Sequence, residues 1–175
     1  METERFERAV RELGRMVFGI ALHALRDRSM AEEITQDVFL ALLEHRERIQ
    51  SDEHLVYWLR QVTSRRCIDQ MRKQRWRRWL LLGEAGEAAG GVASSTAPGD
   101  PLLSARLEKL IRALPAPVRV ALVLRYQVDL DPAEIGRVLG LPEKTVRKKL
   151  RHALNILKSR LDRPRTVMPA ELEQP

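Results

Sequence analysis

The sequence is poor in cysteine and in aromatic residues: among its 175 residues Cys67 is the single cysteine, and aromatic residues make up 5%. One cysteine excludes an intrachain disulfide, favours a reducing compartment and is typical of a small buried apolar side chain. The four histidines stand apart and form no metal-ligand spacing. No apolar run is long enough to cross a membrane, and the charged start METERFERAV is no signal peptide. We therefore expect a cytoplasmic protein with no metal site and no membrane insertion.

Arrangements typical of enzymes are also missing. The sequence has no glycine-rich phosphate loop and no nucleophile placed beside a base. Runs of alternating β-branched residues are absent too, whereas helix-forming residues dominate. These absences predict an all-α protein that is not an enzyme and binds no cofactor.

Positive charge is what the sequence has in excess, with a net charge of +7 and a pI near 10.2. The charge is concentrated in two segments. Residues 58–79 hold eight Lys or Arg against one Asp, and residues 143–161 hold seven against one Glu. This distribution favours an anionic partner, either nucleic acid or a membrane surface.

Residues 129–161 show the pattern of two helices joined by a tight turn. Asp131, Pro132 and Glu134 supply a cap acceptor, a proline for the first helical position and a glutamate three residues after the cap. Gly140 follows where the backbone must turn, and a second helix opens after it. The apolar positions of that helix recur at three- and four-residue spacing: Val146, Leu150, Leu154, Leu157 and Leu161.

The exposed face expected for this second helix is basic, with Lys144, Arg147, Lys148 and Arg151. A glycine turn followed by a basic helix suits insertion into the major groove of DNA. The alternative is a solvated basic helix on an ordinary bundle. We favour DNA binding.

Three helices are expected in the first half of the chain, over residues 4–25, 30–48 and 54–78. The second of them is expected to begin with a capping box formed by Ser29 and Glu32. The residues expected to face inward share helical spacing: Phe6, Val10, Leu13, Val17, Ile20 and Ala24 in the first helix, Ile34, Val38, Ala41 and Leu42 in the second, and Leu55, Leu59, Val62, Ile68 and Met71 in the third.

Two surfaces in this half carry unusual side chains. The second helix has an acidic and polar side with Glu32, Glu33, Gln36 and Asp37, which either complements the helix dipole or docks a basic protein partner. The third helix ends in DQMRKQRWRRW, where basic residues surround Trp76 and Trp79. Basic residues neutralise phosphates and aromatic faces stack on unpaired bases. The alternative is a helix end whose tryptophans cover the core while its arginines are solvated.

Residues 83–101 divide the chain. They contain five of the nine glycines and no Lys or Arg, a composition typical of a flexible linker. A random coil of this length spans roughly 25 Å, so two domains joined in this way could engage separated sites. The expected organisation is a first domain over residues 1–82, the linker, a four-helix domain over residues 102–163 and a disordered tail over residues 164–175. The inward positions expected in the four-helix domain include Leu103, Leu107, Leu110, Leu114, Val118, Leu122 and Val123.

Three segments, taken in order, resemble a sigma factor of bacterial RNA polymerase, specifically the extracytoplasmic-function (ECF) group. AEEITQDVFLAL at residues 31–42 is similar to the region 2 motif that docks on the clamp of the polymerase β′ subunit. WLRQVTSRRCIDQMRKQR at residues 58–75 is similar to the part of region 2 that melts and reads the −10 promoter element. Residues 114–150, which include the helix-turn-helix, are similar to region 4, which reads the −35 element.

The resemblance implies a region 2-like three-helix domain and a region 4-like four-helix domain that bind core RNA polymerase, through its β′ clamp and β flap, and promoter DNA. It implies polymerase contacts by Glu32, Glu33, Gln36, Asp37 and Leu40. It implies −10 contacts by Gln50, Ser51, His54, Arg60, Arg65, Arg72, Lys73 and Trp76, with the polar break at residues 50–54 capturing a flipped base. It implies −35 contacts by Lys144, Thr145, Arg147, Lys148 and Arg151. An anti-sigma factor that covers both domains is a further expectation from the family.

Three positions depart from the family's pattern. Arg65 stands where asparagine is usual, Lys144 replaces a usual glycine, and Gly136 stands where alanine is common. The last change should loosen its helix by about 1 kcal/mol. Two other interpretations stay open: a helix-turn-helix regulator that acts without polymerase, and a sigma mimic that sequesters a regulator. The first leaves residues 31–42 unexplained, and the basic recognition helix argues against the second.

Overall fold

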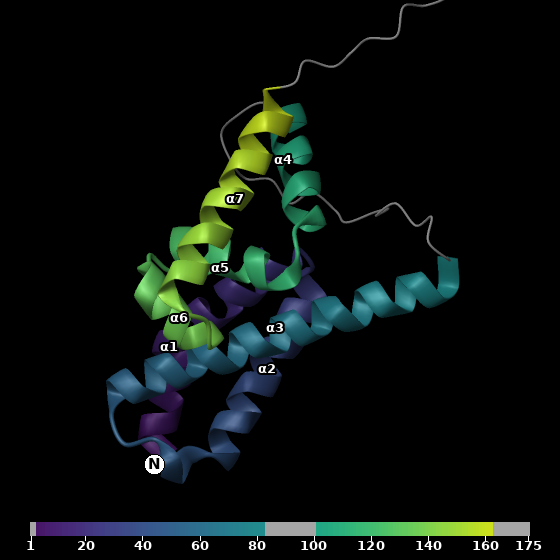
Figure 1. The fold of residues 1–175 in the computed structure, drawn as a ribbon. Coiled ribbons are helices and arrows are strands. Elements are labelled where there is room, and N and C mark those ends of the chain that lie inside the picture. Colours follow the sequence, from purple (N-terminus) through teal and green to yellow (C-terminus); the bar gives the residue numbers. More distant parts are fainter. Residues whose placement is uncertain (1–2, 83–100, 163–175) are drawn as a thin grey trace, which may run out of the picture.

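A computed structural model describes residues 3–82 and 101–162, and within these ranges every regular element is helical (Figure 1). This confirms the all-α prediction. The predicted linker, apart from Pro101, and the predicted disordered tail lie outside the described residues. The described helices are α1 (Thr3–Leu25), α2 (Arg28–Glu44), the short 3-10 helix η1 (Arg46–Arg48), α3 (Asp52–Leu82), α4 (Pro101–Ala113), α5 (Ala116–Tyr126), α6 (Pro132–Leu139) and α7 (Glu143–Leu161).

Helix α1 packs on α2 and α3, and most of its predicted inward face is confirmed. Val17, Ile20 and Ala24 are buried. Val10 is a wrong prediction, because its side chain is 39% exposed, while the neighbouring Ala9 is buried. The covering helices therefore reach the side of α1 that carries Ala9.

The start of α2 also differs from the prediction. Arg26 adopts a positive φ of 57°, so the chain leaves α1 abruptly and Asp27 takes up the extended conformation of a cap residue. The Asp27 carboxylate accepts a hydrogen bond of 3.0 Å from the backbone N–H of Met30. Ser29 therefore lies inside the helix, and Glu32 forms an ion pair with Arg28 at 2.9 Å in place of a capping box. The helix ends at Glu44, earlier than predicted.

The inner face of α2 is as predicted, with Ile34, Val38 and Leu42 buried. Helix α3 begins after Ser51, whose hydroxyl accepts from the backbone N–H of His54 at 3.1 Å. Its predicted core positions are buried or partly buried: Leu55, Leu59, Val62, Ile68 and Met71.

Cys67 of α3 is fully buried, as the sequence predicts for a lone cysteine. Burial raises the pKa of its thiol from 9.0 to about 12, because the thiolate loses hydration. Two polar neighbours, Thr63 and Ser64, are also buried; the Thr63 hydroxyl donates to the backbone carbonyl of Leu59 at 2.6 Å. The thiol is therefore protonated and behaves as a small apolar group.

The helix-turn-helix formed by α6 and α7 follows the prediction closely. Asp131 and Glu134 make a complete capping box, each accepting from the other's backbone N–H at 2.8 Å. Gly140 adopts a φ of 66° at the end of α6, where glycine carries no penalty. On α7, Val146, Leu150 and Leu157 are buried as predicted.

Two predicted core leucines of this unit are exposed instead. Leu154 of α7 is 42% exposed and Leu103 of α4 is 50% exposed. Helix α4 packs mainly along α7 and forms the edge of the molecule, so helical spacing alone overestimates how much of each helix is covered (Figure 1).

Gly136 lies at the point where the turn after α6 folds back on the helix. A Cβ atom added there would stand 2.6 Å from the carbonyl oxygen of Leu141, which is backbone and cannot swing away. The helix-propensity expectation that alanine would be the better residue at this position is therefore wrong in this fold.

We expect Gly136→Ala to lower the free energy of unfolding by about 1–3 kcal/mol, because the turn must shift to admit the methyl group. Gly19→Ala is the matched control, since nothing lies within 4 Å of its added Cβ. That change should raise stability by up to about 1 kcal/mol through helix propensity. Urea unfolding followed by circular dichroism measures both; equal gains from the two substitutions would contradict the steric explanation.

The two halves of the chain pack against each other. Helix α5 contacts α1 and α3, and helix α6 contacts α3, so the helix-turn-helix meets the first half of the chain mainly through α3 (Figure 1). Buried apolar residues of both halves form one continuous cluster. The sequence predicted two helical units but gave no sign of this contact.

Candidate nucleic-acid and protein interfaces

The basic face of α7 is open to solvent. Lys144, Arg147, Lys148 and Arg151 are exposed, Thr145 is partly buried, and the buried apolar residues point the other way. The structure therefore brings the five predicted −35 residues together at the start of one helix, where the recognition helix of a helix-turn-helix meets base edges.

Arg147 is held by an acidic partner that was not predicted to belong to this surface. Its Nε donates to the carboxylate of Glu143 at 2.7 Å, one helical turn earlier. The spacing of four residues with opposite charges is the sequence signal for such a pair. The pair holds the Arg147 guanidinium in one orientation on the basic face of α7.

Four predicted −10 residues lie along α3, from its middle towards its end. Arg65, Arg72, Lys73 and Trp76 are exposed, and Trp76 is 60% exposed. Arg72 lies 3.8 Å from the carboxylate of Asp69, a loose pair in solvent that contributes little stability. Three basic side chains and one large aromatic side chain are thus exposed on the same helix. The helix continues to Leu82, beyond the predicted end, and the side chains of Arg78 and Trp79 lie outside the description.

The polar break before α3 is tied into the helix start. Gln50 and Ser51 are exposed and His54 is partly buried. The backbone N–H of Gln50 donates to His54 Nδ1 at 3.5 Å, while Ser51 caps the helix as described above. These three residues form one local turn.

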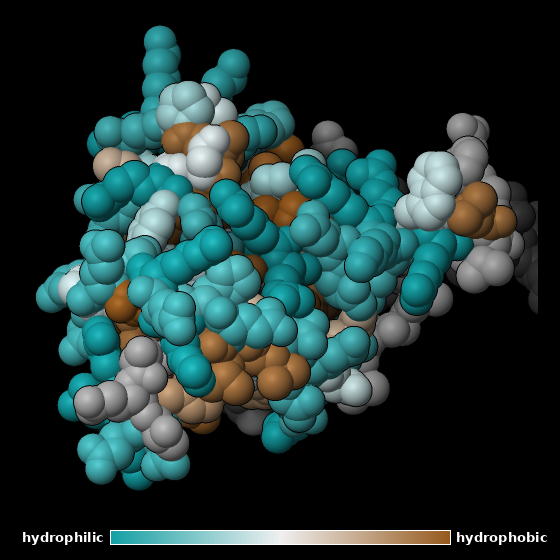
Figure 2. All heavy atoms as spheres, turned by 90° about the horizontal axis from the view of Figure 1, so that it is seen from below, coloured by the Kyte–Doolittle hydropathy of each residue, from teal (hydrophilic) through white to brown (hydrophobic). Residues whose placement is uncertain are grey.

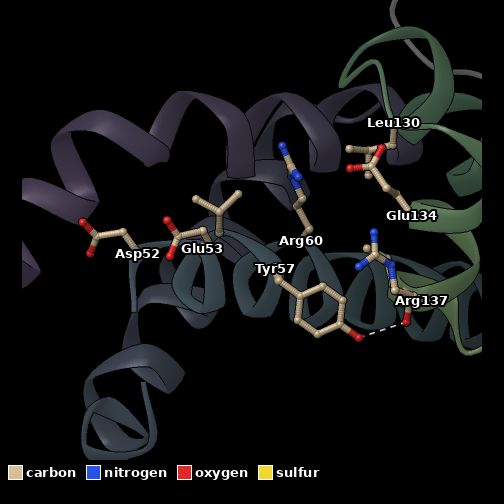
Figure 3. A pocket seen from close by; sticks show the side chains of 9 residues that line it. Asp52, Glu53, Tyr57, Arg60, Leu130, Glu134 and Arg137 are labelled. Carbon is tan, nitrogen blue, oxygen red and sulfur yellow. Dashed lines mark hydrogen bonds between the residues drawn. The ribbon is translucent and has the colours of Figure 1, made fainter. Parts of the chain in front are cut away.

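Arg60 stands apart from that turn. It lines a cavity of about 470 Å³ between α3 and α6, together with Tyr57 from α3 and with Glu134 and Arg137 from α6 (Figure 3). Its Nε is buried and has no hydrogen-bond partner among the described residues. The structure therefore does not place Arg60 with Gln50, Ser51 and His54, nor on the open surface with Arg65.

The outer face of α2 combines acidic and apolar side chains. Glu32, Glu33, Gln36 and Leu40 are exposed, and Leu40 is 60% exposed. Asp37 is partly buried and pairs with Arg66 of α3 at 3.0 Å, which fixes its carboxylate at the edge of this face. Leu43, which was not predicted to belong to this surface, is 42% exposed one turn after Leu40 and extends its apolar part. The five predicted polymerase residues therefore share one surface.

Figure 2 shows one face that is mainly hydrophilic, with hydrophobic side chains gathered in small separate areas. Within residues 3–82 and 101–162, no helix has the length and apolar character required to span a bilayer. The same residues contain no group of three or more side chains suited to hold a metal ion.

Comparisons with known proteins agree with this arrangement. The pattern described as Sigma-70 region 2 matches residues 9–77, and the one described as Sigma-70, region 4 matches residues 104–157. The ECF RNA polymerase sigma factor SigK of Mycobacterium tuberculosis is 28% identical over 151 residues, covering 83% of this chain and 80% of SigK. The SigW factor of Bacillus subtilis is 26% identical over 140 residues, covering 75% of each.

Two further proteins extend the comparison. The probable RNA polymerase sigma factor RfaY of Xanthomonas campestris is 29% identical over 164 residues, which is 90% of this chain but 40% of RfaY, so the chain spans less than half of that relative. The solved structure of the sigma factor RpoE in complex with the anti-sigma factor NepR from Bartonella quintana matches with a TM-score of 0.72 at 18% identity, over 92% of this chain and 100% of RpoE. Region 2 followed by region 4, with relatives that share both, identifies the chain as a sigma-70-family factor of the ECF group.

Proposed function

We propose that the protein is a promoter-specificity subunit that binds core RNA polymerase, directs it to promoters with −35 and −10 elements and assists melting at −10, without catalytic chemistry or a cofactor of its own. The observation that carries this proposal is the presence of two exposed surfaces of opposite character on one chain. The outer face of α2 is acidic and apolar, and the outer face of α7 is basic. A protein that only binds DNA needs the second surface and has no use for the first.

The polymerase contact is assigned to Glu32, Glu33, Gln36, Asp37 and Leu40. Exposed leucines rimmed by charged residues are typical of protein–protein interfaces. The acidic residues suit a basic partner surface, which we take to be the β′ clamp, and they would steer the encounter. The β flap is the expected contact of the second unit.

The −35 contact is assigned to the start of α7. Lys144, Arg147, Lys148 and Arg151 divide between phosphates and base edges, with Thr145 beside them. Lys144, in place of the usual glycine, adds one phosphate-binding group at the helix start, where contacts to DNA are closest.

The −10 contact is assigned to α3 and the turn before it. Gln50, Ser51 and His54 receive the flipped base, and Arg65, Arg72 and Lys73 neutralise the phosphates of the opened strand. Arg60, which lines the cavity beside α6, has no place on that surface in this arrangement. Trp76 supplies a stacking face for an unpaired base. Extraction of a base costs a few kcal/mol of lost stacking and pairing, which these contacts have to offset. Because Arg65 replaces the usual asparagine, base preference at −10 is expected to differ from that of relatives with asparagine there.

An anti-sigma factor is the expected regulator. The matched RpoE is held by NepR in its solved structure. A partner that covers the α2 face and the α7 face of this chain would block polymerase and promoter together.

Run-off transcription tests the proposed function. Purified protein added to core polymerase should produce transcripts from promoters selected out of a genomic library, and should comigrate with core polymerase in size-exclusion chromatography. A helix-turn-helix regulator would instead bind duplex DNA tightly and elute apart from polymerase. Absence of both comigration and promoter-dependent initiation would refute the assignment.

A further inference from the structure

Two arginine head groups in the cavity between α3 and α6 have no partner among the described residues. Arg60 of α3 lines this cavity, and its Nε is buried without a hydrogen-bond partner there. Arg137 lines it from the last turn of α6 and is exposed, and its guanidinium makes no hydrogen bond or ion pair with the described residues. A buried donor that stays unpaired costs free energy, so the Arg60 Nε favours an acceptor inside the cavity.

Carboxylates line the same cavity. Asp52 and Glu53, from the first turn of α3, lie toward one end of it, and Glu134 of α6 lies toward the other (Figure 3). Asp52 is paired with Arg5 of α1 at 2.8 Å, and Glu134 accepts a hydrogen bond from the backbone N–H of Asp131 at 2.8 Å. Both of these carboxylates are therefore already engaged.

Glu53 is the carboxylate that remains available. Its side chain is exposed, and it has no ion pair within residues 3–82 and 101–162. The pKa of Glu53 lies below its usual value, because its carboxylate accepts a hydrogen bond from its own backbone N–H and another from the Ser51 hydroxyl. Glu53 is therefore ionised at neutral pH, and its two oxygens have room for further donors.

The charges of the cavity balance when the arginine paired at its rim is included. The positive side chains are Arg5, Arg60 and Arg137, and the negative ones are Asp52, Glu53 and Glu134. A simple anion would gain the two unpaired arginines but would lie beside carboxylates that repel it, and a simple cation would meet the reverse. A molecule with one charge of each sign matches the cavity better, with its carboxylate at the arginines and its ammonium group at Glu53.

The spacing of these groups sets the length of such a molecule. Glu53 and Arg60 are seven residues apart on α3, or about 10.5 Å along the helix axis, and Arg137 lies on the far side of Arg60 from Glu53 (Figure 3). A free amino acid carries both charged groups on one carbon atom, so it cannot reach both ends. A dipeptide separates them by up to about 7 Å, and the flexible side chains of the protein cover the rest.

The remaining wall of the cavity is apolar. It is formed by Val56, Leu130, Val138 and the ring of Tyr57. The Tyr57 hydroxyl donates to the backbone carbonyl of Arg137 at 3.0 Å, which fixes the ring as part of the wall. The volume of about 470 Å³ lies within the range of roughly 300–1,000 Å³ that is usual for small-molecule sites. The cavity can therefore hold a dipeptide together with apolar side chains.

We propose that the cavity between α3 and α6 binds a dipeptide with apolar side chains, whose carboxylate lies between Arg60 and Arg137 and whose ammonium group lies at Glu53. Guanidinium groups offer forked pairs of donors to a carboxylate, which makes the contact directional. None of the lining residues belongs to α2 or α7, so the site is separate from the proposed polymerase and −35 surfaces. Peptide-bond hydrolysis is the class of reaction that supplies such a ligand.

Alanyl-leucine titrated into the full chain tests the proposal, with binding followed by the NMR shifts of isotope-labelled backbone amides. The dissociation constant expected for a ligand of this size is about 1 mM, with the shifts gathered around the cavity. N-acetyl-alanyl-leucine lacks the ammonium charge and alanyl-leucine amide lacks the carboxylate, so each should bind at least about tenfold more weakly. Free leucine, which cannot reach both ends, should also bind more weakly than the dipeptide.

Variants of the full chain locate the two charged contacts. Arg60→Met keeps the alkyl stem and should weaken alanyl-leucine binding at least about tenfold. Arg137→Met should do the same, and because Arg137 is exposed it reports on the site even where Arg60→Met lowers stability. Glu53→Gln should weaken the dipeptide and leave the affinity for its N-acetyl form unchanged. Arg160→Met is the matched control, because it removes the same charge from an exposed position in the last turn of α7, outside the cavity.

Three results would overturn the proposal: no saturable shift with alanyl-leucine up to about 20 mM, twenty times the expected dissociation constant, equal binding of the dipeptide and its blocked forms, or equal effects of Arg60→Met and Arg160→Met. Each of them is measured on the free protein, without polymerase or promoter. Failure of run-off transcription would therefore refute the proposed function and leave the dipeptide site standing, and the reverse also holds.

Discussion

Replacing both Arg147 and Arg151 with alanine is expected to weaken promoter binding by the holoenzyme at least about thirtyfold. Each arginine contact to a guanine edge or a phosphate is worth about 1–3 kcal/mol, so the pair contributes at least about 2 kcal/mol. Both side chains are exposed on the basic face of α7, so the change leaves the buried residues of that helix untouched. One edge of the Arg147 guanidinium is paired with the carboxylate of Glu143, and the other edge remains to contact DNA. Core-polymerase binding should stay unchanged.

Fluorescence anisotropy of a labelled promoter duplex, titrated with holoenzyme at two salt concentrations, measures this effect. Lys158→Ala with Arg160→Ala is the matched control, because it removes the same charge from the same helix, roughly 10–20 Å further from its first turn. The control should lose only the small share of affinity that long-range charge supplies. If the Arg147 and Arg151 change also abolished comigration with core polymerase, the two surfaces would have been placed wrongly.

Features set by neighbouring residues were predictable from the sequence. The capping box of Asp131 and Glu134 and the left-handed Gly140 depend on residues within one turn of each other, so their spacing is enough to predict them. The same holds for the buried stripe of α2, because helical periodicity is itself local. The candidate polymerase surface of α2 and the candidate −35 surface of α7 were predictable for the same reason. Each is the face of its helix that lies opposite to the buried residues.

Features set by the path of the backbone between helices, or by contacts between distant segments, were not predictable in this way. Ser29 had a favourable capping pattern, yet the sharp exit from α1 at Arg26 moved the cap to Asp27. Helix propensity disfavours Gly136, but the turn that returns over it leaves no room for a Cβ atom. Arg112 sits in an ordinary polar stretch of α4, and its bond to a carbonyl 86 residues earlier depends on how the two units pack. A single sequence holds no local signal for such a pairing.

Leu40→Lys is expected to reduce the affinity for core polymerase by about thirtyfold or more, while binding of the helix-turn-helix to duplex DNA stays the same. Leu40 is 60% exposed in the free protein, so the substitution should change stability by no more than about 0.5 kcal/mol. In the complex, a leucine buried at the interface contributes about 1.5–3 kcal/mol, and the lysine that replaces it would have to be desolvated against a basic partner. Size-exclusion chromatography and a competition titration against wild-type protein for limiting core polymerase measure the loss.

Leu80→Lys is the matched control for that experiment, because Leu80 has the same exposed fraction of 60% but lies near the end of α3, away from the α2 surface. It introduces the same side chain and the same charge, so any general effect of a lysine on solubility or on polymerase binding appears in both variants. Equal losses from the two would mean that α2 is not the docking surface. A loss of polymerase affinity in Leu40→Lys alone would instead show that polymerase docking is separate from promoter binding. The Arg147 and Arg151 change is expected to weaken promoter binding and to leave polymerase binding intact. Opposite outcomes of these two variants require two independent surfaces, and a protein that acts by binding DNA alone would not produce them.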